Sequence, residues 1–197
     1  MNQILQKPLA LLLLIFSLPL YPFLFLAIKL SSKGPFIFSQ NRMGKNRKPF
    51  RIYKFRTMHQ NAEKIKFKYA KLNQSDGPTF KIYNDPRFTP IGRLLAHSAL
   101  DELPQLFNII KGDMAFVGPR PLPVEEANKV PKKYELRFSI LPGLTSPWVI
   151  KGAHKLTFDT WMRLDIEYVS HKNIWYDSKI ILLTGVFIIK SWFSIHV

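Results

Sequence analysis

The longest hydrophobic segment of the chain lies near its N-terminus. Between Lys7 and Lys29, 21 consecutive residues carry no charge. As a helix that rises about 1.5 Å per residue, the segment would be about 32 Å long, just enough to cross a bilayer. Pro19 and Pro22 lie in its second half, and a proline inside a helix removes one hydrogen bond and clashes with the preceding turn. We therefore expect a kink or break near Phe16–Pro19.

Two kinds of membrane segment fit this pattern. A single-span anchor agrees with the hydropathy, whereas a broken helix can enter the membrane and return on the same side. Both flanks are basic and no acidic residue precedes Glu63, so the positive-inside rule would keep both ends in the cytoplasm if the helix turns back. A cleaved signal peptide is disfavoured because the segment ends in Leu26-Ala27-Ile28-Lys29 rather than in small residues.

The middle of the chain alternates between short strands and amphipathic helices. Residues 36–40 and 50–58 have strand patterns and flank the basic loop 41–49. The polar, lysine-rich residues 59–75 predict a surface helix. Apolar residues at helical spacing predict two helices within 91–110, with a break between them.

Glycine and proline mark the ends of elements farther along the chain. Gly112 is expected to end the second of these helices in the left-handed conformation. Residues 114–123 predict a strand that runs into a proline-rich turn. A charged helix is expected from about Val124, and residues 142–147 predict a loop.

The C-terminal segment from Lys155 is aromatic and amphipathic. The last fifty residues contain all four tryptophans, at positions 148, 161, 175 and 192. Helices in the lipid headgroup layer and an ordinary core with aromatic residues at its edge both fit this composition. The apolar stretch Ile180–Ile189 is too short to span a bilayer.

Charge and composition narrow the classes of partner. The net charge of +16 at first favours a nucleic-acid binder. Residues 1–62, however, contain ten Lys and Arg and no acid, and they include the hydrophobic segment. Basic residues beside an apolar segment favour an anionic membrane surface over nucleic acid. The absence of cysteine from the sequence excludes disulfides, Cys-ligated metal sites and a Cys nucleophile.

The segment SALDELP (98–104) carries the most specific candidate chemistry. One interpretation is a helix start, with Ser98 as N-cap and acids in the first turn. The other is phosphate chemistry shared between Asp101 and Glu102. One carboxylate would hold Mg²⁺, which screens a diphosphate, while the other attacks phosphorus.

A second candidate is the segment GPRP (118–121). Pro119 and Pro121 stiffen the backbone around Arg120, which suits bidentate binding of phosphate. A proline-rich turn with a solvated arginine fits the same residues. Lys54 and Arg56 add two cations on a predicted strand, and alone they would indicate only a basic sheet face.

Four segments in this order resemble the bacterial sugar transferase family, whose members include the small monotopic polyprenol-phosphate phosphoglycosyl transferases. They are KGPFIFSQNRMGKNRKPFRIYKFRTM, DPRFTPIGRLL, SALDELPQLFNIIKGDMAFVGPRP and PGLTSPW. The similarity extends over roughly Leu9 to Ile189, which is nearly the whole chain.

The resemblance implies an α/β (α+β), mostly helical fold that is monotopic in the membrane. Residues 1–30 would form a re-entrant helix hairpin broken at Pro19. Residues 31–197 would form a cytoplasmic and interfacial catalytic domain with a small β-hairpin and interfacial amphipathic helices. The protein would lie at the cytoplasmic face of the bacterial inner membrane, in contact with its lipids, and a homodimer is left open.

The family moves a sugar 1-phosphate from a UDP-sugar to a polyprenol phosphate such as undecaprenyl phosphate and releases UMP, the first membrane step of glycoconjugate assembly. The resemblance implies a covalent phospho-sugar on Asp101, Mg²⁺ at Glu102 beside Asp101, and a phosphate ligand in Arg120, next to Pro119. Lys54 and Arg56 are further candidates for offsetting phosphate charge.

Departures from the family pattern leave the sugar undetermined, and they fall at Leu18, Ala96, Leu141, Ser146, Val149 and Ala153. The alternative function is a non-enzymatic basic adaptor that binds anionic lipids at the membrane surface, for which Asp101 and Glu102 would be dispensable. Binding of nucleic acid is disfavoured because the centre of the main motif is acidic.

Overall fold

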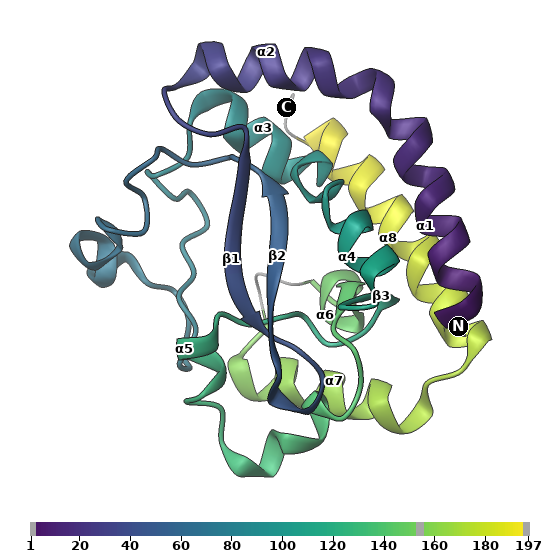
Figure 1. Cartoon of the computed structure of the whole chain (residues 1–197). Coiled ribbons are helices and arrows are strands. Elements are labelled where there is room, and N and C mark those ends of the chain that lie inside the picture. The colour runs from purple at the N-terminus through teal and green to yellow at the C-terminus, as the bar shows by residue number, and fades with distance from the viewer. Residues whose placement is uncertain (1–2, 153–155, 195–197) are drawn as a thin grey trace.

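The N-terminal hydrophobic segment forms a bent helical arm in the computed structural model, which describes residues 3–152 and 156–194. Helix α1 (Gln3–Ser17) continues through a 3₁₀ turn (Leu18–Leu20) into helix α2 (Tyr21–Ser31). Figure 1 shows the ribbon turning a corner between the two helices. Pro19 lies in the 3₁₀ turn, so the predicted break is confirmed.

The arm packs its inner side on the rest of the molecule and exposes its outer side. Helix α1 lies against α4 (Gln105–Lys111), and α2 lies against α3 (Pro90–His97). Ala10 and Ile28 are buried at these two contacts. By length and composition, Ile4–Ser31 is apolar enough to cross a membrane, with a mean hydropathy of 2.5. Membrane association is therefore supported, and the re-entrant path through a bilayer stays a prediction.

The predicted β-hairpin is confirmed. Strand β1 (Ile37–Met43) pairs antiparallel with β2 (Pro49–Phe55), and the register places Arg42 opposite Phe50 and Phe38 opposite Lys54. β1 extends beyond the predicted strand into the basic loop. Side chains directly opposite in an antiparallel pair share a face, so Arg42, Phe50 and Lys54 lie on one face of the hairpin.

The predicted surface helix over 59–75 is wrong for most of its length. The structure has turns followed by a short 3₁₀ helix, η3 (Lys66–Leu72), closed by bonds such as Lys68 N to Ile65 O at 3.0 Å. Lys64 and Lys68 would lie four residues apart on one face of an α-helix. Their like charges would repel there, which disfavours the longer helix.

The two helices expected within 91–110 are confirmed, together with the break between them. Thr89 caps the start of α3 by accepting a hydrogen bond from Gly92 N at 2.9 Å. A 3₁₀ turn, η4 (Leu100–Glu102), separates α3 from α4. Gly112 follows α4 with φ 87°, so its predicted left-handed conformation is confirmed.

A second, parallel pair of strands holds the proline-rich segment. Strand β3 (Ala115–Val117) was expected, but β4 (Gly143–Thr145) falls where a loop was predicted. The remaining elements are helical, and they are α5 (Val124–Ala127), the 3₁₀ helix η5 (Lys132–Phe138), α6 (Pro147–Ile150), α7 (Phe158–His171) and α8 (Ile174–Ser194). The fold is thus α+β and mostly helical.

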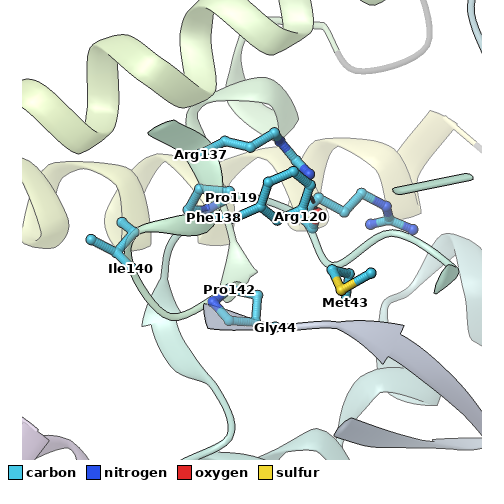
Figure 2. A pocket seen from close by; sticks show the side chains of 8 residues that line it. All are labelled: Met43, Gly44, Pro119, Arg120, Arg137, Phe138, Ile140 and Pro142. Atoms are coloured by element: carbon cyan, nitrogen blue, oxygen red, sulfur yellow. Dashed lines mark hydrogen bonds between the residues drawn. The ribbon is translucent and has the colours of Figure 1, made fainter. Parts of the chain in front are cut away.

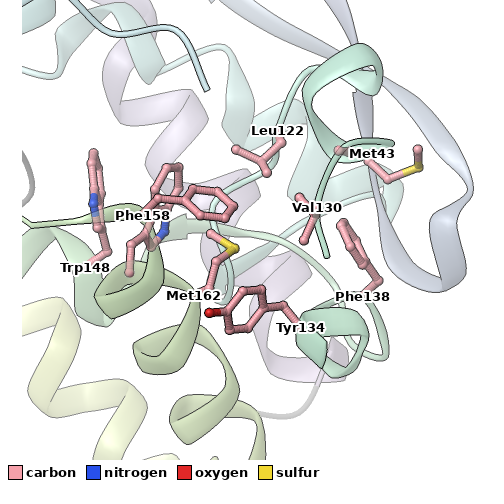
Figure 3. Packing of buried hydrophobic residues seen from close by; sticks show 10 residues of the cluster. Met43, Leu122, Val130, Tyr134, Phe138, Trp148, Phe158 and Met162 are labelled. Carbon is pink, nitrogen blue, oxygen red and sulfur yellow. The ribbon is translucent and has the colours of Figure 1, made fainter. Parts of the chain in front are cut away.

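The aromatic tail divides between the core and the surface. Trp148 and Trp161 are buried in the hydrophobic cluster that contains Phe158 and Met162 (Figure 3). Their rings lie 4.9 Å apart between centroids. For these two tryptophans the core interpretation holds, whereas Trp175 at the start of α8 is 83% exposed. Ala153 lies outside the described residues.

Candidate functional site

The carboxylates of Asp101 and Glu102 lie in the 3₁₀ turn between α3 and α4. Ala99 precedes this turn in the left-handed conformation, with φ 57°. The Ser98 hydroxyl donates backward to the carbonyl of Leu95 at 3.1 Å. Ser98 therefore follows α3 rather than capping α4, and the capping interpretation of this segment is wrong. The chain leaves the helical conformation at Ala99, so the two acids occupy a turn of their own.

Lys54 from strand β2 faces both carboxylates. Its ammonium lies 2.5 Å from Oε1 of Glu102 and 3.6 Å from Oδ2 of Asp101. The Asp101 residue is only 5% exposed, and Glu102 is partly buried. The structure thus brings together three of the predicted site residues, with one cation shared between two acids.

The two carboxyl groups differ in their affinity for a proton. Burial raises the pKa of Asp101 to about 6, although the charge of Lys54 opposes this effect. Burial acts in the same direction on Glu102, but the charges of Lys54 and Arg120 outweigh it and hold the pKa of Glu102 below its usual value. A pair of acids with pKa values moved in opposite directions is typical of sites in which two carboxyl groups have different tasks.

Close contact between two backbone segments positions Arg120. A Cβ on Gly118 would lie 2.5 Å from the carbonyl oxygen of Leu141, so only glycine allows the strands to meet there. The carbonyl of Pro119 accepts a hydrogen bond from Gly143 N at 3.0 Å. Figure 2 shows Pro119 and Arg120 with Pro142 around the small pocket formed where the two segments meet.

The surroundings of Arg120 hold its backbone and its side chain separately. Its carbonyl accepts a hydrogen bond from Arg137 at 2.9 Å, and Arg137 forms a buried ion pair with Asp165 at 2.8 Å. Its guanidinium lies over the ring of Trp148, 5.2 Å from the centroid. Contacts to both its backbone and its guanidinium therefore hold Arg120 in place, which disfavours the interpretation of GPRP as a turn with a solvated arginine.

A small cavity lies between Glu102, the hairpin and the GPRP segment. It is lined by Arg42, Ile52, Lys54, Glu102, Gln105, Arg120, Pro121, Gly143 and Leu144. Arg42 was not singled out from the sequence, where it lies in a basic stretch that resembles a solvated loop. The signal that could have found it is strand register, because Arg42 shares a hairpin face with Lys54 once β1 is extended.

Arg56 does not join this cavity. Its guanidinium donates to the carbonyls of Ile28 and Ser32, at 3.2 and 2.6 Å, and to that of Lys33. These carbonyls end helix α2 and begin the following loop. The geometry therefore indicates that Arg56 holds the arm to strand β2, and a role in offsetting phosphate charge stays a prediction.

The described residues contain no cluster of three or more His, Asp or Glu side chains that could enclose a metal ion. The two acidic side chains do converge on one cation, the Lys54 ammonium. Mg²⁺ is commonly held by one or two carboxylates together with substrate phosphates and water. Asp101 and Glu102 thus fit Mg²⁺ that arrives with a phosphate substrate.

Comparison with known proteins points to one family. A family model described as bacterial sugar transferase matches residues 1–191. Galactosyl transferase CpsE of Streptococcus agalactiae is 47% identical over 152 residues, which cover 77% of this chain and 34% of that protein. The UDP-glucose:undecaprenyl-phosphate glucose-1-phosphate transferase of Escherichia coli is 37% identical over 185 residues, or 89% of this chain and 37% of that protein. The chain therefore spans about a third of the length of these two relatives.

A shorter relative matches over most of its own length. The exopolysaccharide production protein ExoY of Rhizobium meliloti is 34% identical over 176 residues, which cover 87% of this chain and 77% of that protein.

Proposed function

Because the chain belongs to the bacterial sugar transferase family, we propose that it transfers a sugar 1-phosphate from a UDP-sugar to a polyprenol phosphate at the cytoplasmic face of the inner membrane. The observation that carries this proposal is the pair of Asp101 and Glu102 around the Lys54 ammonium, where Lys54 and Glu102 line one cavity with Arg120. The relatives support the class of reaction, since one of them is a UDP-glucose:undecaprenyl-phosphate glucose-1-phosphate transferase.

In the first step, a carboxylate oxygen of Asp101 attacks the phosphorus that carries the sugar. A new P–O bond forms to Asp101, and the bond from that phosphorus to the bridging oxygen of the diphosphate breaks. The bridging oxygen leaves with UMP, and the sugar phosphate remains on the aspartate. A carboxylate with a raised pKa suits this task, because it is more basic than an exposed aspartate and still largely ionised at pH 7.

In the second step, an oxygen of the polyprenol phosphate attacks the phosphorus of the phospho-aspartate. The P–O bond to Asp101 breaks, and the carboxylate is regenerated as the polyprenol diphosphate sugar forms. A phosphate monoester has a second pKa near 6 and is already ionised at neutral pH, so the step needs no strong base.

The remaining residues of the cavity offset negative charge. Lys54 lowers the repulsion between two acids and an incoming diphosphate, and Arg120 offers a guanidinium fork that suits phosphate oxygens. Mg²⁺ bound at Glu102 and Asp101 would supply further charge neutralisation to the diphosphate. Gln105 adds an amide at the same wall of the cavity.

The test is release of UMP from a panel of UDP-sugars with undecaprenyl phosphate and Mg²⁺. Asp101→Asn should abolish turnover and covalent labelling by a donor labelled in its sugar, because an amide is a far weaker nucleophile. Asp113→Asn is the matched control, since Asp113 lies outside the cavity and pairs with the exposed Lys111. Full activity of Asp101→Asn would contradict the mechanism.

A lipid-binding adaptor gives the opposite result. It predicts no UMP release with any donor and unchanged membrane binding when Asp101 and Glu102 are replaced. A homodimer stays an untested prediction.

A further inference from the structure

Arg42 forms no salt bridge within the described residues, and the charges of Glu126, Glu63 and Glu102 act on it only from beyond salt-bridge distance. One of its terminal nitrogens donates to the carbonyl of Pro121 at 3.1 Å. Its Nε is buried and has no acceptor, and no carboxylate oxygen of the described chain lies within 4.0 Å of its guanidinium. A buried donor without an acceptor is costly, and water or a bound anion can satisfy one that lies beside a cavity.

Arg120 lines the same cavity and likewise forms no salt bridge within the described residues. Within the described residues its guanidinium contacts the ring of Trp148 and forms no ion pair. The two guanidinium groups also affect each other. Burial, and after it the charge of Arg120, lower the pKa of Arg42 to about 10. Two arginines that repel each other in a partly buried cavity gain stability when an anion binds between them.

Lys54 differs from both arginines, although it lines the same cavity. Its ammonium is neutralised by two carboxylates, as described above. Arg42 lies on the same hairpin face, twelve residues earlier in the chain. In this cavity Lys54 therefore pairs with the two acids, whereas Arg42 and Arg120 are available to bind a ligand.

We propose that Arg42 and Arg120 together bind one phosphate group of a substrate, as a subsite separate from the Lys54 ammonium. A guanidinium presents parallel N–H donors that match the oxygens of phosphate, and two such forks can enclose a single tetrahedral anion. The identity of the substrate rests on the proposed function. The phosphate belongs either to the diphosphate of the UDP-sugar or to the monoester of the polyprenol phosphate, which share this chemistry.

Binding measurements test the subsite without requiring turnover. Calorimetric titration of UDP, UMP and inorganic phosphate into the detergent-solubilised full chain should show that Arg42→Gln weakens the affinity for at least one of them by about 10- to 100-fold, as expected for lost hydrogen bonds to a charged group. Arg51→Gln is the matched control, because Arg51 lies exposed on the partner strand of the same hairpin. Its affinities should stay within about two-fold of wild type.

A double variant tests whether the two arginines share one phosphate. If they do, Arg42→Gln combined with Arg120→Gln should lose less affinity than the two single losses multiplied together, because the second change removes a contact already weakened. If the fold-loss of affinity in the double variant equals the product of the two single fold-losses, the shared subsite is overturned. If Arg42→Gln does not fold, Arg42→Lys keeps the charge and removes the fork. Wild-type affinities in a folded Arg42→Lys would also overturn it.

Kinetics then assign the source of the phosphate. A rise in KM for the UDP-sugar alone assigns the subsite to the donor, and a rise for polyprenol phosphate alone assigns it to the acceptor. Wild-type affinities for all three probes, with both KM values unchanged in Arg42→Gln, would overturn the proposal. If the wild-type protein binds these probes but transfers no sugar phosphate, the proposed function fails while the subsite stands.

Discussion

Burial raises the pKa of Asp101, and the charges of Lys54, Glu102 and Arg120 modify it; of these three neighbours, we replace Lys54. The nucleophile acts as a carboxylate, so with a pKa of about 6 the transfer rate should fall as pH drops below about 6. Lys54 lowers this pKa by its charge. Lys54→Gln should therefore move the acid limb of the rate profile upward by about one pH unit, in addition to lowering kcat. Lys48→Gln, an exposed change on the same hairpin, should leave the limb in place. A Lys54→Gln profile with an unshifted limb would contradict this assignment.

Asp101 should also reduce stability where it is ionised. Its folded pKa lies above the ordinary value of 3.8, so the folded state holds this proton more tightly than the unfolded state. The stability of the wild-type protein relative to Asp101→Asn should then decrease as pH rises from about 4 to about 6, by at most about 1.4 kcal/mol per pH unit. Chemical unfolding of both proteins at several pH values measures this difference. A difference that is constant with pH would show that Asp101 has an ordinary pKa.

At the scale of elements, Arg56 links the N-terminal arm to the β-hairpin. Its guanidinium satisfies three carbonyls at the end of α2, while Lys54 two residues earlier serves the carboxylates. Arg56→Met would remove the guanidinium donor from all three carbonyls, of which, in the described part of the chain, only that of Ile28 keeps a backbone donor, Ser32 N. We expect a loss of about 2–4 kcal/mol in the free energy of unfolding in detergent, compared with less than about 0.5 kcal/mol for the exposed Arg51→Met. Equal losses in the two variants would contradict the linking role.

Elements governed by local interactions could be predicted from the sequence. The hairpin, the break at Pro19 and the left-handed Gly112 follow from strand alternation and from the backbone limits of proline and glycine. The prediction that Ser98 is an N-cap was wrong because helix N-caps and helix C-terminal turns use the same residue types. The left-handed conformation of Ala99, which separates them, is rare for a residue with a Cβ and has no local signal in the sequence.

The site depends on contacts between distant parts of the chain. Lys54 meets Glu102 across 48 positions, and Arg42 meets Pro121 across 79. Each of these cations lies among other lysines and arginines in the sequence. Composition therefore showed that the region is basic. Only the fold shows that Lys54 pairs with the two acids and that Arg42 and Arg120 do not.

At the scale of the whole molecule, the carboxylate turn lies one layer beneath the exposed arm. The turn connects α3 and α4, on which α2 and α1 pack, and Figure 1 shows the arm extending over both helices. The outer surface of the arm is apolar, with Phe16 73% exposed and Phe23 75% exposed. If this surface lies in lipid, the cavity is held near the headgroup layer, where the phosphate of a polyprenol phosphate would be found.

This arrangement makes a specific prediction about topology. A re-entrant arm places both of its ends on the cytoplasmic side, whereas a spanning arm places them on opposite sides. The chain has no cysteine, so Gln3→Cys and Lys33→Cys each introduce one thiol, and Lys48→Cys on the hairpin loop marks the cytoplasmic side. A membrane-impermeant maleimide should label all three in inside-out vesicles and none in intact spheroplasts. Labelling of Gln3→Cys in spheroplasts, with the other two protected, would show that the arm spans the membrane and that the bend at Pro19 does not return it.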